Sequence, residues 1–405
     1  MTQGQNVDPA QAQGAQIPLQ SFSLPQFPPQ AGSLRALTLT SDIKLDEYQE
    51  LLSQPFTIPP LPPGIESLTL ELFSLGYPPG WLSQLADRLP NIKSLVVYSQ
   101  LFNGISAESM ADAVEFFKKL PGLRALHLLD CFARPKFFTS IAPYVKYCHE
   151  GEYARRGLMF LEINYTVQHA DSDFLPNIQA AELPSLLGSG LISAAFNISE
   201  ADVTDDPEDP TNLGAKSGEE MAKDGVVAVN KTQSAVLVEA LTAESRPQIL
   251  KVLNSTLFTL TPADLKKILE KQTKIMVLSS TIEIDGYETF CEDLTQTLSP
   301  LENLEQIEIV ANPSLQFFMA VSIETSTVFD SLLTFQISNT RAKAIEKAFP
   351  SSETMEALSK KATKLNSFKA NILRSSAMPK VEWEKKDGTW TGGPKKPTTH
   401  LVTPE

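Results

Sequence analysis

A short apolar phrase of the form LxxLxL recurs through the first half of this 405-residue chain. Consecutive copies begin between 27 and 35 residues apart, and they run over residues 34–39, 65–70, 92–97, 123–128 and 158–163. The phrase alone arises often by chance, so the regular spacing carries the signal. A spacing near thirty residues is typical of a leucine-rich repeat that holds one strand and one helix. The sequence therefore predicts a stack of such repeats.

Weaker copies of the phrase continue the series. They run over residues 191–196, 275–278, 304–309 and 332–337. The stretches between the phrases have helical patterns. One begins at Ser106, a good helix cap, and another begins with Thr261 followed by proline. Leu-Pro turns at residues 89–91 and 120–122 end a helix and lead into the next strand.

These features predict an α/β fold of the leucine-rich-repeat solenoid type. Parallel strands are expected on the concave face and helices on the convex face of a curved horseshoe or arc. Burying the three strand aliphatics of one repeat contributes about 5–9 kcal/mol, while ordering about thirty residues costs about 45 kcal/mol. A single repeat is therefore unstable, and neighbouring repeats must share a continuous core.

Composition divides the chain into four parts. A glutamine- and proline-rich start is expected to be a flexible leader, and an acidic stretch inside the repeats is expected to be a disordered insertion. Two helical segments after the last repeat suit a polar end cap. The predicted parts are a leader over 1–32, a solenoid over 33–340 with its insertion at about 199–231, a helical cap over 341–374 and an irregular tail over 375–405.

Two local motifs have a structural and a functional interpretation. The proline-rich run over residues 55–64 is either a rigid connector that replaces the helix of the first repeat or a ligand for a proline-binding module. Strand phrases on both sides favour the connector. Trp383 and Trp390 lie in a polar tail, where they either pack on the last repeat or form a short binding motif. Packing is favoured.

The net charge of −14 disfavours nucleic acid and anionic lipid as partners. Apolar runs are too short to span a membrane, and the N-terminus lacks the pattern of a secretory signal. Three widely spaced cysteines are typical of reduced thiols inside a cell. We therefore expect an intracellular protein, cytoplasmic or nuclear, that is a monomer and binds one or more proteins of unknown identity.

Catalysis is not expected, and no cofactor or metal is predicted. His127 and Cys131 are close in sequence, but nothing in the spacing supplies the third group that a nucleophile pair needs. A zinc site from Cys131, Cys148, His149 and His169 lacks the usual ligand spacing. The weaker enzyme hypothesis is a hydrolase with a groove at His127, Cys131 and Glu162.

The strand face offers the better candidate for function. The leucines of each phrase point inward, so the intervening positions point outward and form columns across the strands. Tyrosine and arginine, which binding hot spots favour, occur in these columns. The predicted partner-binding residues are Lys93, Tyr98, Arg124, His127, Glu162, Asn164 and Tyr165.

The strand phrases and the Leu-Pro turns at 89–91 and 120–122 resemble the ribonuclease-inhibitor-like class of leucine-rich repeats. In particular, the chain looks like the divergent F-box/leucine-rich-repeat-like proteins of fungi, over about residues 33–340. The resemblance implies that the repeats hold a protein substrate, as in the substrate-recognition subunit of a ubiquitin ligase. Residues 1–32 depart from the family because they lack the helical pattern of an F-box.

Overall fold

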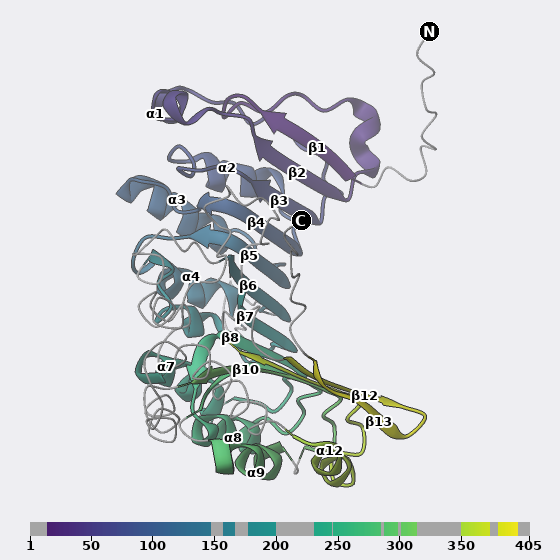
Figure 1. The fold of residues 1–405 in the computed structure, drawn as a ribbon. Coiled ribbons are helices and arrows are strands. Elements are labelled where there is room, and N and C mark those ends of the chain that lie inside the picture. The colour runs from purple at the N-terminus through teal and green to yellow at the C-terminus, as the bar shows by residue number, and fades with distance from the viewer. Residues whose placement is uncertain are drawn as a thin grey trace, which may run out of the picture. The chain divides into compact units, whose positions relative to one another are not determined.

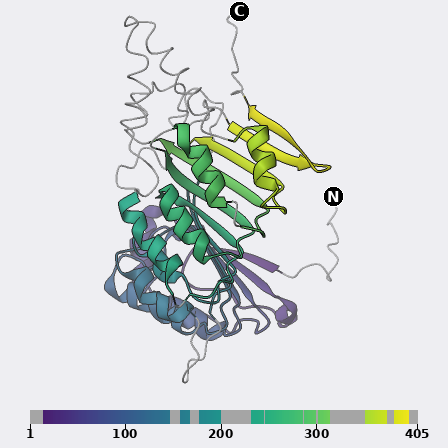
Figure 2. The ribbon, with the colours of Figure 1, turned by 90° about the horizontal axis from the view of Figure 1, so that it is seen from below.

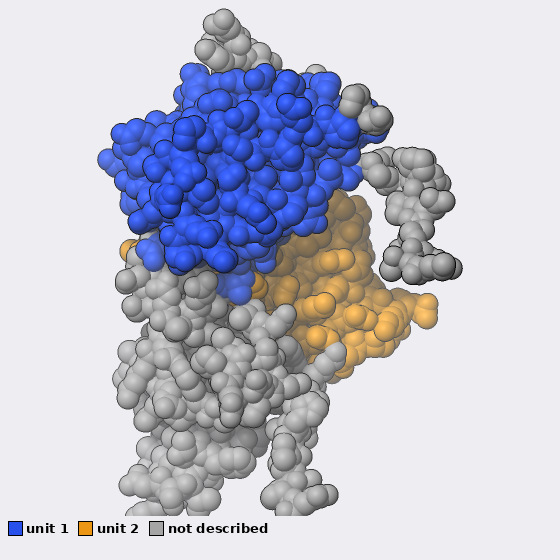
Figure 3. Space-filling view, turned by 90° about the horizontal axis from the view of Figure 1, so that it is seen from above, with its two compact units in different colours: residues 1–166, 172–194 blue, residues 167–171, 195–405 orange. Residues whose placement is uncertain are grey.

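A computed structural model describes residues 14–146, 157–166, 177–199, 231–244, 246–284, 287–298, 301–313, 350–372 and 380–395. The chain divides into two compact units (Figure 3). Unit 1 holds residues 1–166 with 172–194, and unit 2 holds residues 167–171 with 195–405. The division falls inside strand β7, Ser193–Ser199.

Unit 1 contains six strands that lie side by side in chain order, each parallel to the next. The strands are β1 Gly14–Leu19, β2 Ala36–Ser41, β3 Ser67–Glu71, β4 Ser94–Leu101, β5 Ala125–Phe132 and β6 Phe160–Thr166. Strands β2 to β6 coincide with the five predicted phrases. Parallel neighbours in chain order are what a leucine-rich repeat requires.

Helices α1 to α4 lie on one side of this sheet (Figure 1). The helices of unit 1 are η1 Pro29–Ser33, α1 Leu45–Ser53, α2 Trp81–Arg88, α3 Ala107–Lys118, α4 Phe137–Val145 and η2 Leu183–Leu186. The phrase aliphatics point into the layer between strands and helices, where Leu39, Leu70 and Val97 are fully buried. On the other side of β2 to β6, the described residues of unit 1 form no α-helix, and we call this side the open face.

Each repeat is joined to the next by one shared carbonyl. The carbonyl of Lys93 accepts the N–H groups of Arg124 and Ala125, and the carbonyl of Glu66 accepts those of Lys93 and Ser94. Before each of β2 to β5, the first apolar residue of the phrase closes a turn, as Ile92 N–H does to the carbonyl of Leu89. These repeated bonds fix the register of the phrases across the sheet.

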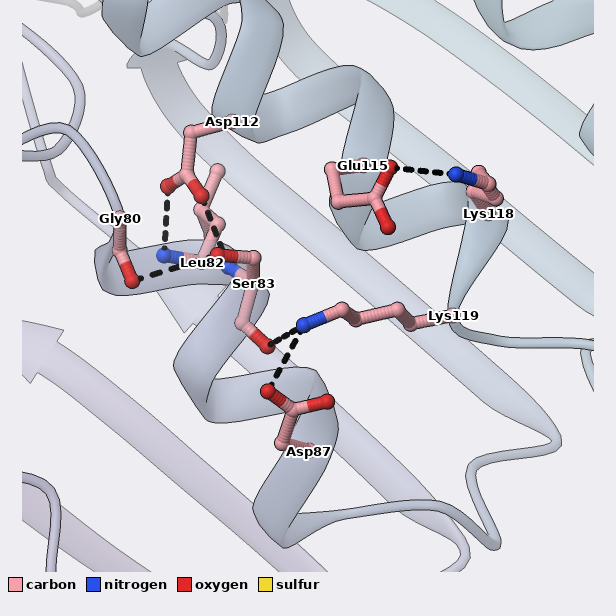
Figure 4. Close-up of polar contacts among 8 residues, drawn as sticks. All are labelled: Gly80, Leu82, Ser83, Asp87, Asp112, Glu115, Lys118 and Lys119. Carbon is pink, nitrogen blue, oxygen red and sulfur yellow. Dashed lines mark hydrogen bonds and ion pairs between the residues drawn. The ribbon is translucent and has the colours of Figure 1, made fainter.

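A carboxylate from one repeat also caps the helix of its neighbour (Figure 4). Asp112 of α3 is buried, and its two oxygens accept the N–H groups of Leu82 and Ser83 at 2.9 and 3.1 Å. These groups lie in the first turn of α2, which has no capping side chain of its own. Lys119 Nζ also pairs with Asp87 Oδ2 at 2.7 Å. The first turn of α2 therefore depends on α3.

The predicted flexible leader is wrong for residues 14–32. Residues 14–19 form β1, and Phe22 and Leu24 are buried. Trp81 Nε1 donates to the carbonyl of Phe22 at 2.8 Å, and the two rings pack edge to face. The glutamine- and proline-rich composition concealed these few apolar side chains, which are enough to add a strand to the sheet. Residues 1–13 lie outside the described part.

Strand β1 ends the strand order of unit 1. Asp42 N–H donates to the carbonyl of Leu19, so the backbone of Leu19 faces β2. Because backbone groups alternate in direction along a strand, the backbone of Pro18 faces away from β2. Proline lacks an N–H group, and this is the position on an edge strand where that loss breaks no bond of the sheet.

The proline-rich run packs against the core with part of its side chains, as the connector interpretation predicts. Ile58 and Leu61 are buried, and Thr57 exchanges hydrogen bonds with Ser23 and Leu24. It does not replace the helix of the first repeat, however. Helix α1 precedes it and is anchored by Tyr48, whose hydroxyl donates to the carbonyl of Gly76 at 3.0 Å.

Unit 2 contains parallel strands followed by an antiparallel hairpin (Figure 2). After β7, its strands are β8 Val252–Leu260, β9 Val277–Ile284, β10 Gln306–Pro313, β11 Ser367–Ile372, β12 Lys380–Lys386 and β13 Thr389–Lys395. Its helices are α7 Lys231–Thr242, α8 Pro262–Lys271, α9 Tyr287–Leu298 and α12 Ser352–Ser359. Helix α8 begins with a complete capping box between Thr261 and Asp264, at the predicted start.

Hydroxyl groups replace aliphatics in the core of β8 and β9. Ser255 and Ser280 are register partners with no exposed surface, and their hydroxyls lie 2.9 Å apart. Just after Ser255, the register of β8 shifts, which leaves residues 256–258 as a bulge. Thr281 Oγ1 donates to the carbonyl of Thr256 at 2.7 Å and is thereby satisfied. The bulge thus supplies an acceptor for a buried hydroxyl of β9.

Two expectations at the C-terminal end need correction. Within the predicted helical cap, α12 is helical, but residues 367–372 form strand β11. Residues 380–395 of the predicted irregular tail instead form the hairpin of β12 and β13. Trp383 and Trp390 are buried, and Trp383 Nε1 donates to the carbonyl of Pro350 at 3.0 Å. The packing interpretation of the tryptophans is therefore confirmed.

The fold class is α/β of the leucine-rich-repeat type, as predicted. Phrases at 275–278 and 304–309 lie in or next to β9 and β10, with Leu278, Leu304 and Ile309 buried. The acidic insertion, from residue 200 to 230, and the phrase at 332–337 lie outside the described residues.

Candidate interaction face

Three rows of side chains cross the open face of unit 1 from β2 to β6. Each row contains register partners, which lie directly opposite one another on neighbouring strands. The first row is Ala36, Ser67, Ser94, Ala125 and Phe160; the second is Thr38, Thr69, Val96, His127 and Glu162; the third is Thr40, Glu71, Tyr98, Leu129 and Asn164.

The rows change character from β3 to β4. On β2 and β3 they consist of alanine, serine, threonine and one glutamate. On β4 to β6 they include large side chains, of which Tyr98 is 42% and Phe160 is 43% exposed. Met159, just before β6, is 36% exposed. Exposed aromatic side chains beside charged groups are typical of protein-binding surfaces.

Three of the predicted residues take part in two polar pairs between neighbouring strands. Lys93 Nζ lies 2.9 Å from Glu66 Oε1, and both side chains are about half exposed. His127 Nδ1 lies 2.9 Å from Glu162 Oε2. The second pair joins β5 to β6 in the middle row, so the structure brings His127 and Glu162 together. Such partly exposed pairs contribute little to stability and leave their outer polar atoms available to a partner.

Two other predicted residues differ in their contacts. Arg124 Nη1 donates to the carbonyl of Gly157 at 2.9 Å, which joins the start of one repeat to the next. Asn164 lies in the third row, and its buried side-chain oxygen has no hydrogen-bond partner among the described residues. A role of either residue in binding stays a prediction.

The prediction of Tyr165 as a surface residue is wrong. Strand β6 continues to Thr166 with regular alternation, so Tyr165 points inward and is fully buried. Its hydroxyl donates to the carbonyl of Cys131 at 3.0 Å. Burial raises the pKa of this phenol well above its usual value.

The proposed catalytic cysteine is also buried. Cys131 has no exposed surface, whereas His127 lies in the second row of the open face. Burial raises the pKa of the Cys131 thiol, and the nearby Asp130 carboxylate adds to this effect. A neutral, inaccessible thiol cannot act as the nucleophile of the hydrolase hypothesis. Cys148, His149 and His169 lie outside the described residues.

Sequence reasoning missed two exposed apolar residues on or next to the strands of the open face, Phe160 and Leu72. Phe160 lies two residues before Glu162, and strand alternation places both on the same face. That signal was present in the sequence, because the same alternation defines the first row. Leu72, which is 47% exposed directly after β3, had no such signal.

No group of three or more potential metal ligands occurs among the residues that the structure describes. Within the same residues, no helix is both long enough and apolar enough to cross a membrane.

Comparison with known proteins adds little to these observations. No protein-family model matches the chain, and a search of curated proteins gave no match. Among solved structures, the complex of Rad7 and Elc1 from yeast matches with a TM-score of 0.34 and 16% sequence identity, over 83% of this chain and 75% of that chain. A match at this level carries no argument, so the fold assignment rests on the strands themselves.

Proposed function

We propose that this chain is a non-catalytic scaffold that recognises another protein through the open face of unit 1. The observation that supports the proposal is the group of large side chains on β4 to β6, with Tyr98 and Phe160 more than 40% exposed. A solvent-exposed sheet face that binds no partner needs no exposed aromatic side chains. The threonine-rich rows on β2 and β3 are an example of such a surface.

The predicted residues on or next to β4 to β6 have complementary roles in the proposal. Tyr98 provides an aromatic anchor, and Lys93, His127 and Glu162 provide charged and hydrogen-bonding groups around it. Of the remaining predicted residues, Arg124 and Asn164 stay candidates at the edge of the same patch. Tyr165 is excluded because it is buried. The three sparse cysteines support an intracellular location, cytoplasmic or nuclear.

Affinity capture from the native cells, followed by mass spectrometry, tests this function. We expect the full chain to capture one or a few proteins, and we expect Tyr98→Ala and Phe160→Ala to lose them. The matched controls are Thr38→Ala and Thr69→Ala, which truncate the same face on β2 and β3. If all four variants capture the same proteins as the unchanged chain, the open face is not the binding surface.

The enzyme hypothesis has a separate test. In the folded chain, we expect Cys131 to resist a thiol-alkylating reagent at pH 8, because burial raises its pKa and excludes the reagent. In denaturant the same thiol is expected to react at the ordinary rate of a cysteine. Rapid alkylation of Cys131 in the native chain, mapped by peptide mass spectrometry, would reopen the hydrolase hypothesis.

A further inference from the structure

Three neighbouring strands of unit 1 turn at the same position into the left-handed backbone region. The residues are Leu72, Ser99 and Asp130, with φ of 63°, 49° and 48°. Each directly follows a third-row residue, namely Glu71, Tyr98 and Leu129. The turn lets the next side chain enter the core, where Phe73, Gln100 and Cys131 are buried.

This turn requires a left-handed backbone but does not require a leucine. Left-handed conformation costs about 1–2 kcal/mol per residue for most side chains and least for glycine, asparagine and aspartate. Asp130 suits the position, and its carboxylate accepts hydrogen bonds from the N–H and hydroxyl of Thr166 at 2.6 and 2.9 Å. Leu72 is instead a large apolar side chain that is 47% exposed. Neither backbone geometry nor burial accounts for it.

The backbone of Leu72 lies beside that of Tyr98, the aromatic residue of the third row. Its N–H donates to the carbonyl of Tyr98 at 3.0 Å, and Tyr98 is 42% exposed. Glu71, the residue before Leu72, is the register partner of Tyr98. We call Glu71, Leu72 and Tyr98 the Leu72–Tyr98 spot. It places two exposed apolar groups within one strand spacing of a carboxylate.

The charge of this spot is not compensated within the described residues. The acids Glu66 and Glu162 on the same side have Lys93 and His127 as partners. No ion pair or side-chain hydrogen bond to a described residue engages the Glu71 carboxylate. An apolar surface next to an uncompensated negative charge is complementary to an apolar side chain next to a positive one.

We propose that the Leu72–Tyr98 spot binds a segment of the partner protein in which an aliphatic or aromatic residue stands beside a lysine or arginine. The inference rests on the proposed function and names the chemistry of the partner at that face. A basic group there is positioned to pair with Glu71 and to lie over the Tyr98 ring. A second copy of this chain is disfavoured as the occupant, because two chains of net charge −14 repel each other.

Selection of short random peptides on the immobilised full chain tests the proposal. We expect selected peptides to carry lysine or arginine within two positions of a large apolar residue. Binding of one synthetic peptide, measured by fluorescence polarisation, should weaken about tenfold in Tyr98→Ala and about tenfold in Glu71→Lys. Exchanging the basic residue of the peptide for glutamate should restore binding to Glu71→Lys.

Leu72→Asn provides a variant that keeps the fold, because asparagine accepts the left-handed region more readily than leucine. Its thermal unfolding should occur at the same or a higher temperature, while peptide binding weakens several-fold. Thr69→Ala, on the same strand, should leave the affinity unchanged.

Several outcomes would overturn the inference. One is selection of peptides without the basic–apolar pairing, or of none; another is equal binding by Glu71→Lys and the unchanged chain. Self-association that Glu71→Lys or Tyr98→Ala abolishes, seen by sedimentation, would identify a second copy as the occupant. The proposed function fails separately, when Tyr98→Ala and Phe160→Ala retain every captured protein. A partner lost in Phe160→Ala but retained in Glu71→Lys and Leu72→Asn would leave the function standing without this spot.

Discussion

The two units build the same strand–helix repeat with different cores. In unit 1 the third core position of the phrase is always aliphatic, with Leu39, Leu70, Val97, Leu128 and Ile163 buried. In unit 2 the same position on β8 and β9 holds Ser255 and Ser280, whose hydroxyls bond to each other. The repeat therefore tolerates a polar core position when the neighbouring repeat supplies the partner.

One helix of each unit shows a related difference. The first turn of α2 in unit 1 is capped by Asp112, which belongs to the next helix. The first turn of α8 in unit 2 is capped by its own Thr261 and Asp264, as that of α3 in unit 1 is capped by its own Ser106. At α2 the cap joins neighbouring repeats, whereas at β8 and β9 the side-chain hydroxyls of the core do so.

The largest expected effect comes from the aliphatic core of unit 1. Leu128→Ala should lower the free energy of unfolding by about 2–5 kcal/mol, because it removes buried methyl groups and leaves a cavity. Chemical denaturation combined with hydrogen exchange of β5 peptides measures this loss. Leu72→Ala, which shortens an exposed leucine in the same unit, is the control. Similar losses in both variants would contradict the burial of Leu128 in the aliphatic core of unit 1.

Removal of the shared cap should have the next largest effect. Asp112→Ala should cost about 1–2 kcal/mol, because two N–H groups at the start of α2 lose their acceptor. Hydrogen exchange should increase in both α2 and α3. Thr261→Ala in unit 2 should cost a similar amount, with faster exchange limited to α8. Faster exchange of α3 alone in Asp112→Ala would show that the cap does not couple the two helices.

The serine pair of unit 2 should show coupling of smaller size. Ser255→Ala alone should cost about 1 kcal/mol, because the hydroxyl of Ser280 loses its partner. The double variant Ser255→Ala with Ser280→Ala should cost less than the sum of the single variants, by about 0.5–1 kcal/mol. A double-mutant cycle from denaturation curves gives this coupling. Strict additivity would mean that the two hydroxyls do not act together.

The smallest effect is expected at the surface pair between α2 and α3. Asp87→Ala should change the stability of unit 1 by no more than about 1 kcal/mol, since more than half of the Asp87 side chain is exposed. The change should shrink further at high salt. Comparison of the denaturation midpoints at low and high salt tests this. A loss as large as that of Asp112→Ala would show that surface charge, not the buried cap, joins the helices.

The contrast between aliphatic and polar core positions explains how much of the fold the sequence could predict. Strands β2 to β6 were found because all three core positions of each phrase are aliphatic. Strand β8 was missed because Ser255 occupies the third position, and β11 because Ala370 does. Strand β1 was not predicted because the surrounding residues are rich in glutamine and proline, although Ile17 and Leu19 alternate as a strand requires. A repeat with serine at the third position, as in β8 and β9, shows only the first two core positions of the phrase, from which β9 was predicted and β8 was missed.

The candidate face was predicted in part for a related reason. Alternation from the phrase correctly placed Tyr98, His127 and Glu162 on the open face. Phe160 was overlooked because the column before the second leucine was not counted, and Tyr165 was misplaced because β6 extends one residue further. The left-handed turn at Leu72 cannot be read from a leucine, whose side chain disfavours that backbone.

The position of Pro18 has a consequence for the behaviour of the chain at high concentration. An exposed parallel strand is a template on which a foreign strand can grow, and stacked repeats are especially open to such end-to-end addition. A strand that added to the outer edge of β1 would lack one hydrogen-bond donor, because Pro18 has no backbone N–H. A second chain that added to this edge of β1 would therefore lose one hydrogen bond of the sheet at Pro18.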